Sequence, residues 1–217
     1  MNRGSQKQNT DQLIEALATK LAPVRVLPHP LWRLLRWAFV ALCYIALVVY
    51  FVGFRPDLTV KLQNPFFLFE LAMAAAMSLS GAFAGFWLCV PDMRGQEWMI
   101  VPPLVLFSVF MVRAGLHIVL DDGMVMPDHL WSHCTTGAVL FGVVPASAIF
   151  YLSIRGRTTH IHMLPMMNAF AVGGLGYIAL RIVCTSDDIG HDFVYHMLPY
   201  VAFGVLLSLS GRYIYRW

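Results

Sequence analysis

The sequence predicts an all-α membrane protein, in which a short amphipathic helix precedes a bundle of six transmembrane helices. Of the 217 residues, 59% are hydrophobic and 12% are charged, which is about half the charged share of an average soluble domain. The mean hydropathy of +0.66 agrees with this composition. The apolar residues also fill runs close to the roughly 20 residues that a helix needs to cross the hydrocarbon. We therefore expect most of the chain to contact membrane lipids.

Residues 1–30 precede the first long apolar run, so we expect an N-terminal segment and linker there and a membrane domain over residues 31–217. The segment is polar or amphipathic, and we expect no cleavable signal peptide. A helix is predicted over residues 9–22, where Asn9 or Thr10 can cap its start. Prolines follow it and predict an extended spacer before the first span.

The N-terminal helix has one apolar face and no soluble domain against which to pack it. Four residues at helical spacing form this face: Leu13, Ile14, Leu17 and Leu21. Its polar face carries a single Lys among acids, unlike the basic face of a helix that lies on a membrane surface. We therefore favour a protein partner for this face over the inner leaflet.

Charged and proline-rich breaks separate the apolar runs into six predicted spans. These are residues 37–54, 66–90, 98–120, 134–152, 161–183 and 193–210. With the N-terminus inside, the inner segments hold eleven Lys and Arg residues and the outer loops hold two, Arg55 and Lys61. The positive-inside rule then predicts that both termini are cytoplasmic.

Three charged residues fall inside the predicted spans, all in the outer half of the membrane. Because an unpaired arginine is costly at that depth, we expect Glu70 to pair with Arg113 and Arg181, and favour this pairing over a transport pathway. Between spans, small residues allow close helix packing. The second span offers Gly81 and Gly85, and the fifth offers a glycine cluster at residues 173–176.

The predicted outer loops contain six aspartates and no Lys or Arg between spans three and four and between spans five and six. Such a surface attracts cations. Thiol, imidazole and thioether groups gather there, and the candidate ligands are Met126, His129, His133, Cys134 and Cys184. Spans four and five form a hairpin with a short inner loop, so the two cysteines are expected at the same depth.

These ligand types suit copper, zinc or cadmium better than magnesium or calcium. The spacing matches no strong metal motif, and an oxidising compartment can equally convert the two cysteines into a structural disulfide. The sequence leaves both alternatives open: a thiol pair that senses a metal ion or an oxidant, and a static disulfide. No obligatory cofactor is expected.

Other classes of function fit the sequence less well. No nucleophile, base and orienting group converge by pattern, so we expect no enzyme. A haem protein needs an axial histidine inside the bundle, and a metal transporter needs polar groups along its depth, which the inner half almost lacks. The small net charge of +3 gives no reason to expect direct binding of nucleic acid.

Several short motifs, in order along the six-span chain, resemble the NrsF-type membrane anti-sigma factors of bacteria. The motifs are Leu13-Ile-Glu-Ala-Leu17, Leu21-Ala-Pro-Val-Arg25, Gly53-Phe-Arg-Pro-Asp-Leu58, the Trp131-containing approach to Cys134, Cys184 followed by Asp187 and Asp188, and the closing Arg216-Trp217. The resemblance covers nearly the whole chain.

The resemblance implies a regulator in the bacterial inner membrane that has no catalytic activity. It implies that the segment around Leu13 and Leu17 sequesters an extracytoplasmic-function sigma factor. It also implies that Cys134 and Cys184 match the two motif cysteines of the family, which are implicated in release of the sigma factor under metal or oxidant stress.

Overall fold

The computed structural model describes residues 3–19, 27–90, 95–120, 133–156 and 158–215. This part of the chain is helical and contains no strand. Its elements are α1 (Arg3–Ala18), α2 (Pro30–Val52), α3 (Leu58–Lys61), α4 (Pro65–Leu88), η1 (Glu97–Ile100), α5 (Val101–Leu120), α6 (His133–Ile154), α7 (Met163–Val183), α8 (Ile189–His191), η2 (Asp192–Met197), α9 (Leu198–Leu209) and α10 (Gly211–Ile214). The predicted helical bundle is confirmed.

Six of the described helical segments are long and apolar enough to cross a membrane, as predicted. The first begins at Pro30 and not at residue 37, because two arginines that had been taken as a break lie inside the helix. His29 caps this helix and Pro30 occupies its first turn, where a missing N–H costs nothing. Arg33 is buried and donates hydrogen bonds to the main-chain carbonyls of Phe86 and Leu152.

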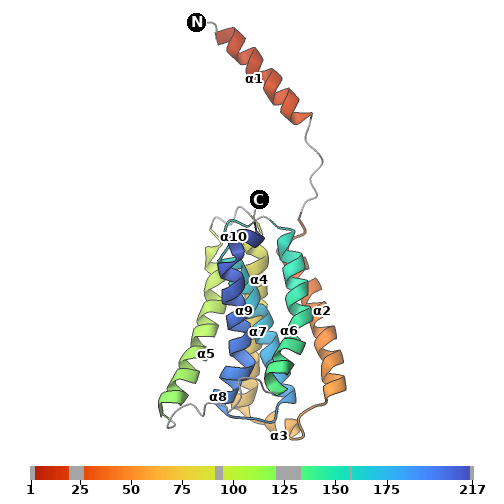
Figure 1. Ribbon diagram of the computed structural model, residues 1–217, viewed down its shortest axis with the longest axis vertical. Coiled ribbons are helices and arrows are strands. Elements are labelled where there is room, and N and C mark those ends of the chain that lie inside the picture. The colour runs from red at the N-terminus through yellow and green to blue at the C-terminus, as the bar shows by residue number, and fades with distance from the viewer. Residues whose placement is uncertain (1–2, 20–26, 91–94, 121–132, 157, 216–217) are drawn as a thin grey trace.

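The long helices stand side by side, with α7 at the centre of the bundle (Figure 1). α7 packs against α4, α6 and α9 and is the most buried of the six spans. The predicted role of small residues is confirmed at the α4–α7 contact. A Cβ at Gly174 would lie 2.5 Å from the carbonyl oxygen of Ala74, and one at Gly81 would lie 3.0 Å from the main chain of Ala171.

The N-terminal helix begins earlier than the sequence predicts. Asn9 and Thr10 lie inside α1, so the prediction that one of them caps the helix is wrong. Leu13, Ile14 and Leu17 are 59%, 58% and 59% exposed. Leu21, the fourth residue of the predicted apolar face, lies outside the described residues.

The long helices give the bundle two ends (Figure 1). The end at which α3 and α8 lie is called the α8 end below. The opposite end, which holds α10 and is the end nearer α1, is called the α10 end. The described residues of the predicted outer loops, among them Asp187, Asp188 and Asp192, belong to the α8 end.

Candidate functional site

The α8 end brings the two predicted cysteines together. Cys134 is the second residue of α6, and Cys184 directly follows the last turn of α7. Their Sγ atoms are 3.3 Å apart, and both thiols are free and half-buried. The prediction that they lie at the same depth is confirmed, although they are fifty residues apart in the chain.

The two thiols differ from the other cysteines in their surroundings. A hydrogen bond from Cys134 stabilises the thiolate of Cys184 and lowers its pKa below the ordinary value. Burial instead raises the pKa of Cys89, near the α10 end, and Cys43 lies on the exposed side of α2. Because the thiolate is the reactive and metal-binding form, the contact with Cys134 favours the form of Cys184 that reacts and binds metals.

Two histidines complete the cluster around these thiols. The Nε2 atom of His191, the last residue of α8, is 3.6 Å from the Sγ of Cys184. His196, in η2, is fully buried, and its ring lies 5.3 Å from that of His191. One potential ligand atom from each of the four residues lies within 4.8 Å of the other three.

Besides the two cysteines, the sequence predicted three ligands that lie close to Cys134 in the chain: Met126, His129 and His133. Of those, His133 is exposed at the first position of α6 and is not among the four residues that converge. Met126 and His129 lie outside the described residues, so their role stays a prediction. His191 and His196 lie on the same predicted outer loop as Cys184 but were not among the candidate ligands.

The local helix type explains why these histidines meet. Residues Asp192–Met197 form a π-helical turn, in which the hydrogen bonds run between residues five apart. A π turn therefore brings His191 and His196 closer to one face than an α-helix does. Single π turns inside α-helices are frequent at functional sites.

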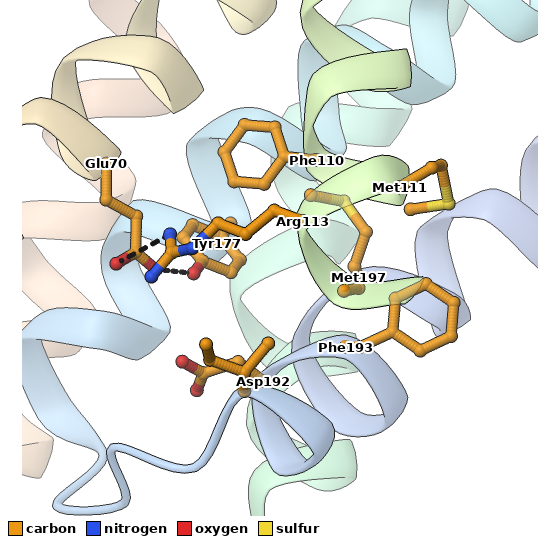
Figure 2. Close-up of a pocket in the computed structure, with 10 residues that line it drawn as sticks. Glu70, Phe110, Met111, Arg113, Tyr177, Asp192, Phe193 and Met197 are labelled. Atoms are coloured by element: carbon orange, nitrogen blue, oxygen red, sulfur yellow. Dashed lines mark hydrogen bonds and ion pairs between the residues drawn. The ribbon is translucent and has the colours of Figure 1, made fainter. Parts of the chain in front are cut away.

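A network of buried ion pairs adjoins the cluster. Arg181 lies at its centre: its Nη1 atom is 3.1 Å from the Oδ2 of Asp192, and its Nε atom is 3.5 Å from the Oε1 of Glu70. Figure 2 shows Glu70 facing Arg113 and Tyr177, and the Arg113 contact is 3.2 Å long. The predicted pairing of Glu70 with both arginines is confirmed.

A cavity of about 30 Å³ lies beside this network, lined in part by Glu70, Arg113 and Asp192 (Figure 2). That volume is enough for one or two water molecules. The cavity beside the ion pairs is therefore too small for an organic substrate.

Two of the sequence motifs meet at the surface of the α8 end. Arg55, whose side chain is fully buried, contacts Asp57 at 2.7 Å and Asp187 at 3.1 Å. Partial burial alone would raise the pKa of Asp187, but hydrogen bonds from Lys61 and Arg55 outweigh it and hold that pKa at about 2. The chain after α2 is thereby tied to the segment that carries Cys184.

The comparison with known protein families gives one match. The model of a family described as negative regulator of sigma F, NrsF, matches residues 17–217. No curated protein and no solved structure matches the chain.

Proposed function

Because the chain belongs to the NrsF family of negative regulators of sigma F, we propose that it is a membrane-embedded anti-sigma factor without catalytic activity. It holds an extracytoplasmic-function sigma factor through α1 and releases it when a metal ion or an oxidant acts on Cys134 and Cys184. The family is a regulatory one and implies a sigma factor as partner.

The exposed apolar face of α1 is the observation that carries this proposal. Leu13, Ile14 and Leu17 lie on one side of a helix whose side chains from Thr10 to Thr19 are all exposed. Burial of a leucine side chain against a partner contributes about 1.5–3 kcal/mol, so three such residues can supply a docking surface. The family match begins at residue 17, and Leu13 and Ile14 therefore rest on the helix geometry alone.

The exposed apolar surface of the bundle supports a location in the membrane. Phe39, Phe51, Phe66, Val119 and many other large apolar side chains point outward, which soluble monomers avoid. The excess of Lys and Arg at the α10 end and in the N-terminal segment supports a cytoplasmic position for both. The proposed location is the bacterial inner membrane, with the α8 end and its thiols on the outer side.

The opposite positions of the thiols and α1 require the signal to cross the bundle. A stimulus can shift a two-state equilibrium only by binding its two states unequally. Copper, zinc and cadmium prefer thiolate and imidazole ligands, and an oxidant acts on the thiolate. Either stimulus changes the contacts of Cys134 and Cys184, which lie on different helices.

The test is capture of the sigma factor by the full-length protein in detergent micelles. Leu17→Asp places a charge at the centre of the apolar face and is expected to lower capture at least about 10-fold, because an unpaired charge is costly to bury. Gln12→Asp adds the same charge to the opposite side of α1 and is expected to capture the sigma factor as the parent does. Lys20→Ala is expected to be nearly silent.

Equal capture by the parent and Leu17→Asp would mean that the binding surface lies elsewhere, in the loops of the α10 end. An equal loss of capture in Leu17→Asp and Gln12→Asp would show that binding depends on the charge of α1 and not on its apolar face.

A further inference from the structure

Four side chains at the α8 end present soft or borderline ligand atoms to one point. Cys134 comes from α6, Cys184 follows α7, and His191 and His196 come from α8 and η2. Their ligand atoms all lie within 4.8 Å of one another. Convergence from three separate segments of the chain is not a consequence of sequence proximity, and it requires the fold.

The distances match those of a four-coordinate metal site. With sulfur about 2.3 Å and nitrogen about 2.05 Å from a tetrahedral zinc ion, neighbouring sulfurs are about 3.8 Å apart, and a sulfur and a nitrogen about 3.6 Å. The Sγ atoms of Cys134 and Cys184 are 3.3 Å apart, and Sγ of Cys184 lies 3.6 Å from Nε2 of His191. Small side-chain adjustments therefore suffice to close such a site.

His196 supplies a second, independent observation. Its side chain is fully buried, and neither of its ring nitrogens has a hydrogen-bond partner among the described residues. Buried polar atoms without partners are rare because each costs free energy. A metal ion at the cluster would give one of these nitrogens a partner.

The surroundings of His196 also resemble those of a metal-bound histidine. The Oδ1 atom of Asp192 lies 3.1 Å from Nδ1 of His196, outside hydrogen-bonding geometry, while Oδ2 lies 3.1 Å from Arg181. Metal-binding histidines commonly direct their other ring nitrogen to a carboxylate, which orients the ring. Asp192 beside Nδ1 favours Nε2 of His196 as the ligand.

We propose that Cys134, Cys184, His191 and His196 form a four-coordinate site for a soft or borderline divalent metal ion of the zinc and cadmium class. The site rests on the proposed function, because it specifies how the thiol pair recognises a metal signal. Two sulfur–metal and two nitrogen–metal bonds replace metal–water bonds, any proton that the two thiols still carry is released, and no electron is transferred. Two sulfurs and two nitrogens in tetrahedral arrangement suit zinc, and the two thiolate charges neutralise the ion.

A metal ion in the site would add bonds between separate elements of the α8 end. The four bonds would join the start of α6 to the end of α7 and to the turn before α9, where the reduced protein has only the thiol and imidazole contacts. Asp192 connects this site to Arg181, and Arg181 connects it to Glu70 on α4. Metal binding therefore acts on four of the six spans.

The test is titration of the reduced, purified full-length protein with cobalt(II), a spectroscopic substitute for zinc, followed by displacement with zinc or cadmium. We expect one ion per chain, with the thiolate-to-cobalt charge-transfer absorption and the intense visible bands of a tetrahedral complex. His191→Ala and His196→Ala each remove a ligand and are expected to lower the affinity at least about 100-fold. Asp192→Asn, which keeps all four ligands but weakens the contact of Asp192 with Nδ1 of His196, is expected to cost about 10–100-fold.

His133→Ala is the matched control, because His133 adjoins Cys134 but does not converge with the cluster, and it is expected to bind as the parent does. Since His196 is buried, His191→Ala tests the site at a half-buried position where folding is less affected. Absence of the charge-transfer band in the reduced parent would overturn the site, as would parental affinity in both histidine variants. These results do not depend on capture of the sigma factor, so the site and the proposed function can fail separately.

Discussion

The two ends of the bundle satisfy their polar groups in different ways. At the α8 end, buried arginines pair with carboxylates from other parts of the chain, as Arg55 does with Asp187 and Arg181 with Asp192. At the α10 end, buried Arg33 donates to main-chain carbonyls, and the large apolar residues of α1 are exposed. The α8 end is therefore held by ion pairs between distant parts of the chain, whereas on the side of the α10 end the apolar side chains of α1 remain exposed.

α7 is the most buried of the helices that run between the two ends. Arg181 in its last turn belongs to the ion-pair network, while Asn168 in its second turn donates to Ser153 of α6 near the other end. Between them, close contact with α4 through Gly81 and Gly174 leaves little space for independent movement. Closely packed helices shift between discrete arrangements more readily than they deform, which makes α7 the best-placed helix to relate the two ends.

The largest expected effect is that variants on the two sides of the bundle give opposite phenotypes. Cys184→Ser removes a thiol at the α8 end and is expected to leave the sigma factor bound while abolishing induction by metal or oxidant. Leu17→Asp changes α1, on the side of the α10 end, and is expected to give full target-gene expression without a stimulus. The double variant should behave as Leu17→Asp does, because release at α1 no longer needs a signal. Reporter-gene expression in cells measures all three.

Two controls sharpen this comparison. Cys134→Ser should reproduce Cys184→Ser, since the two thiols are in contact, and Cys43→Ser should respond as the parent does, since Cys43 lies apart on α2. Normal induction in both Cys134→Ser and Cys184→Ser would mean that these cysteines take no part in sensing, and the functional contrast between the ends would then fail.

The sequence predicted the features that follow from hydropathy and helix length. The six helices, the pairing of Glu70 with Arg113 and Arg181, and the proximity of Cys134 and Cys184 all follow from depth in a membrane, because each residue's depth can be counted along its span. Glycine packing between α4 and α7 follows from the same reasoning.

The features that the sequence did not predict depend on contacts between helices or on irregular helix geometry. The sequence placed Arg33 before the first span, but carbonyl oxygens from α4 and α6 satisfy its guanidinium inside the bundle. A π turn brings His191 and His196 together beside the thiols. No periodic pattern in the sequence predicts a π turn. The sequence shows that both residues are histidines, but it does not show the directions in which their side chains project.

The next largest effect concerns two arginines that contact the same carboxylate. Arg181→Met is expected to lower the free energy of unfolding by about 3–5 kcal/mol, because it leaves the buried carboxylates of Glu70 and Asp192 without that partner. Arg113→Met should cost about 1 kcal/mol or less, since the Arg113 side chain is 46% exposed and Glu70 keeps Arg181 and Tyr177. Unfolding in detergent micelles measures both variants. Equal losses would show that the ion-pair network at the α8 end does not depend on burial.

The smallest effect is a pH dependence at the surface of the α8 end. The pKa of Asp187 in the folded protein is about 2, below the ordinary aspartate value of 3.8. Ionised Asp187 therefore stabilises the fold at pH values above about 4. That contribution falls as the pH drops from about 4 through 2, because the unfolded chain takes up the proton first. The side chain of Asp187 is 40% exposed, and solvent screening keeps the effect below about 1 kcal/mol.

Asp187→Asn removes the titrating group and keeps the shape of the side chain, so the difference in unfolding free energy between parent and variant isolates this residue. That difference should be constant from pH 7 to about pH 5 and should shrink as the pH falls from 4 to 2. Arg55 and Lys61 remain charged throughout this range, so the change reports Asp187 alone among the three. If the difference stayed constant down to pH 2, the contacts of Asp187 with Arg55 and Lys61 would contribute no charge-dependent stability, and the α8 end would owe its order to the buried pairs of Arg181.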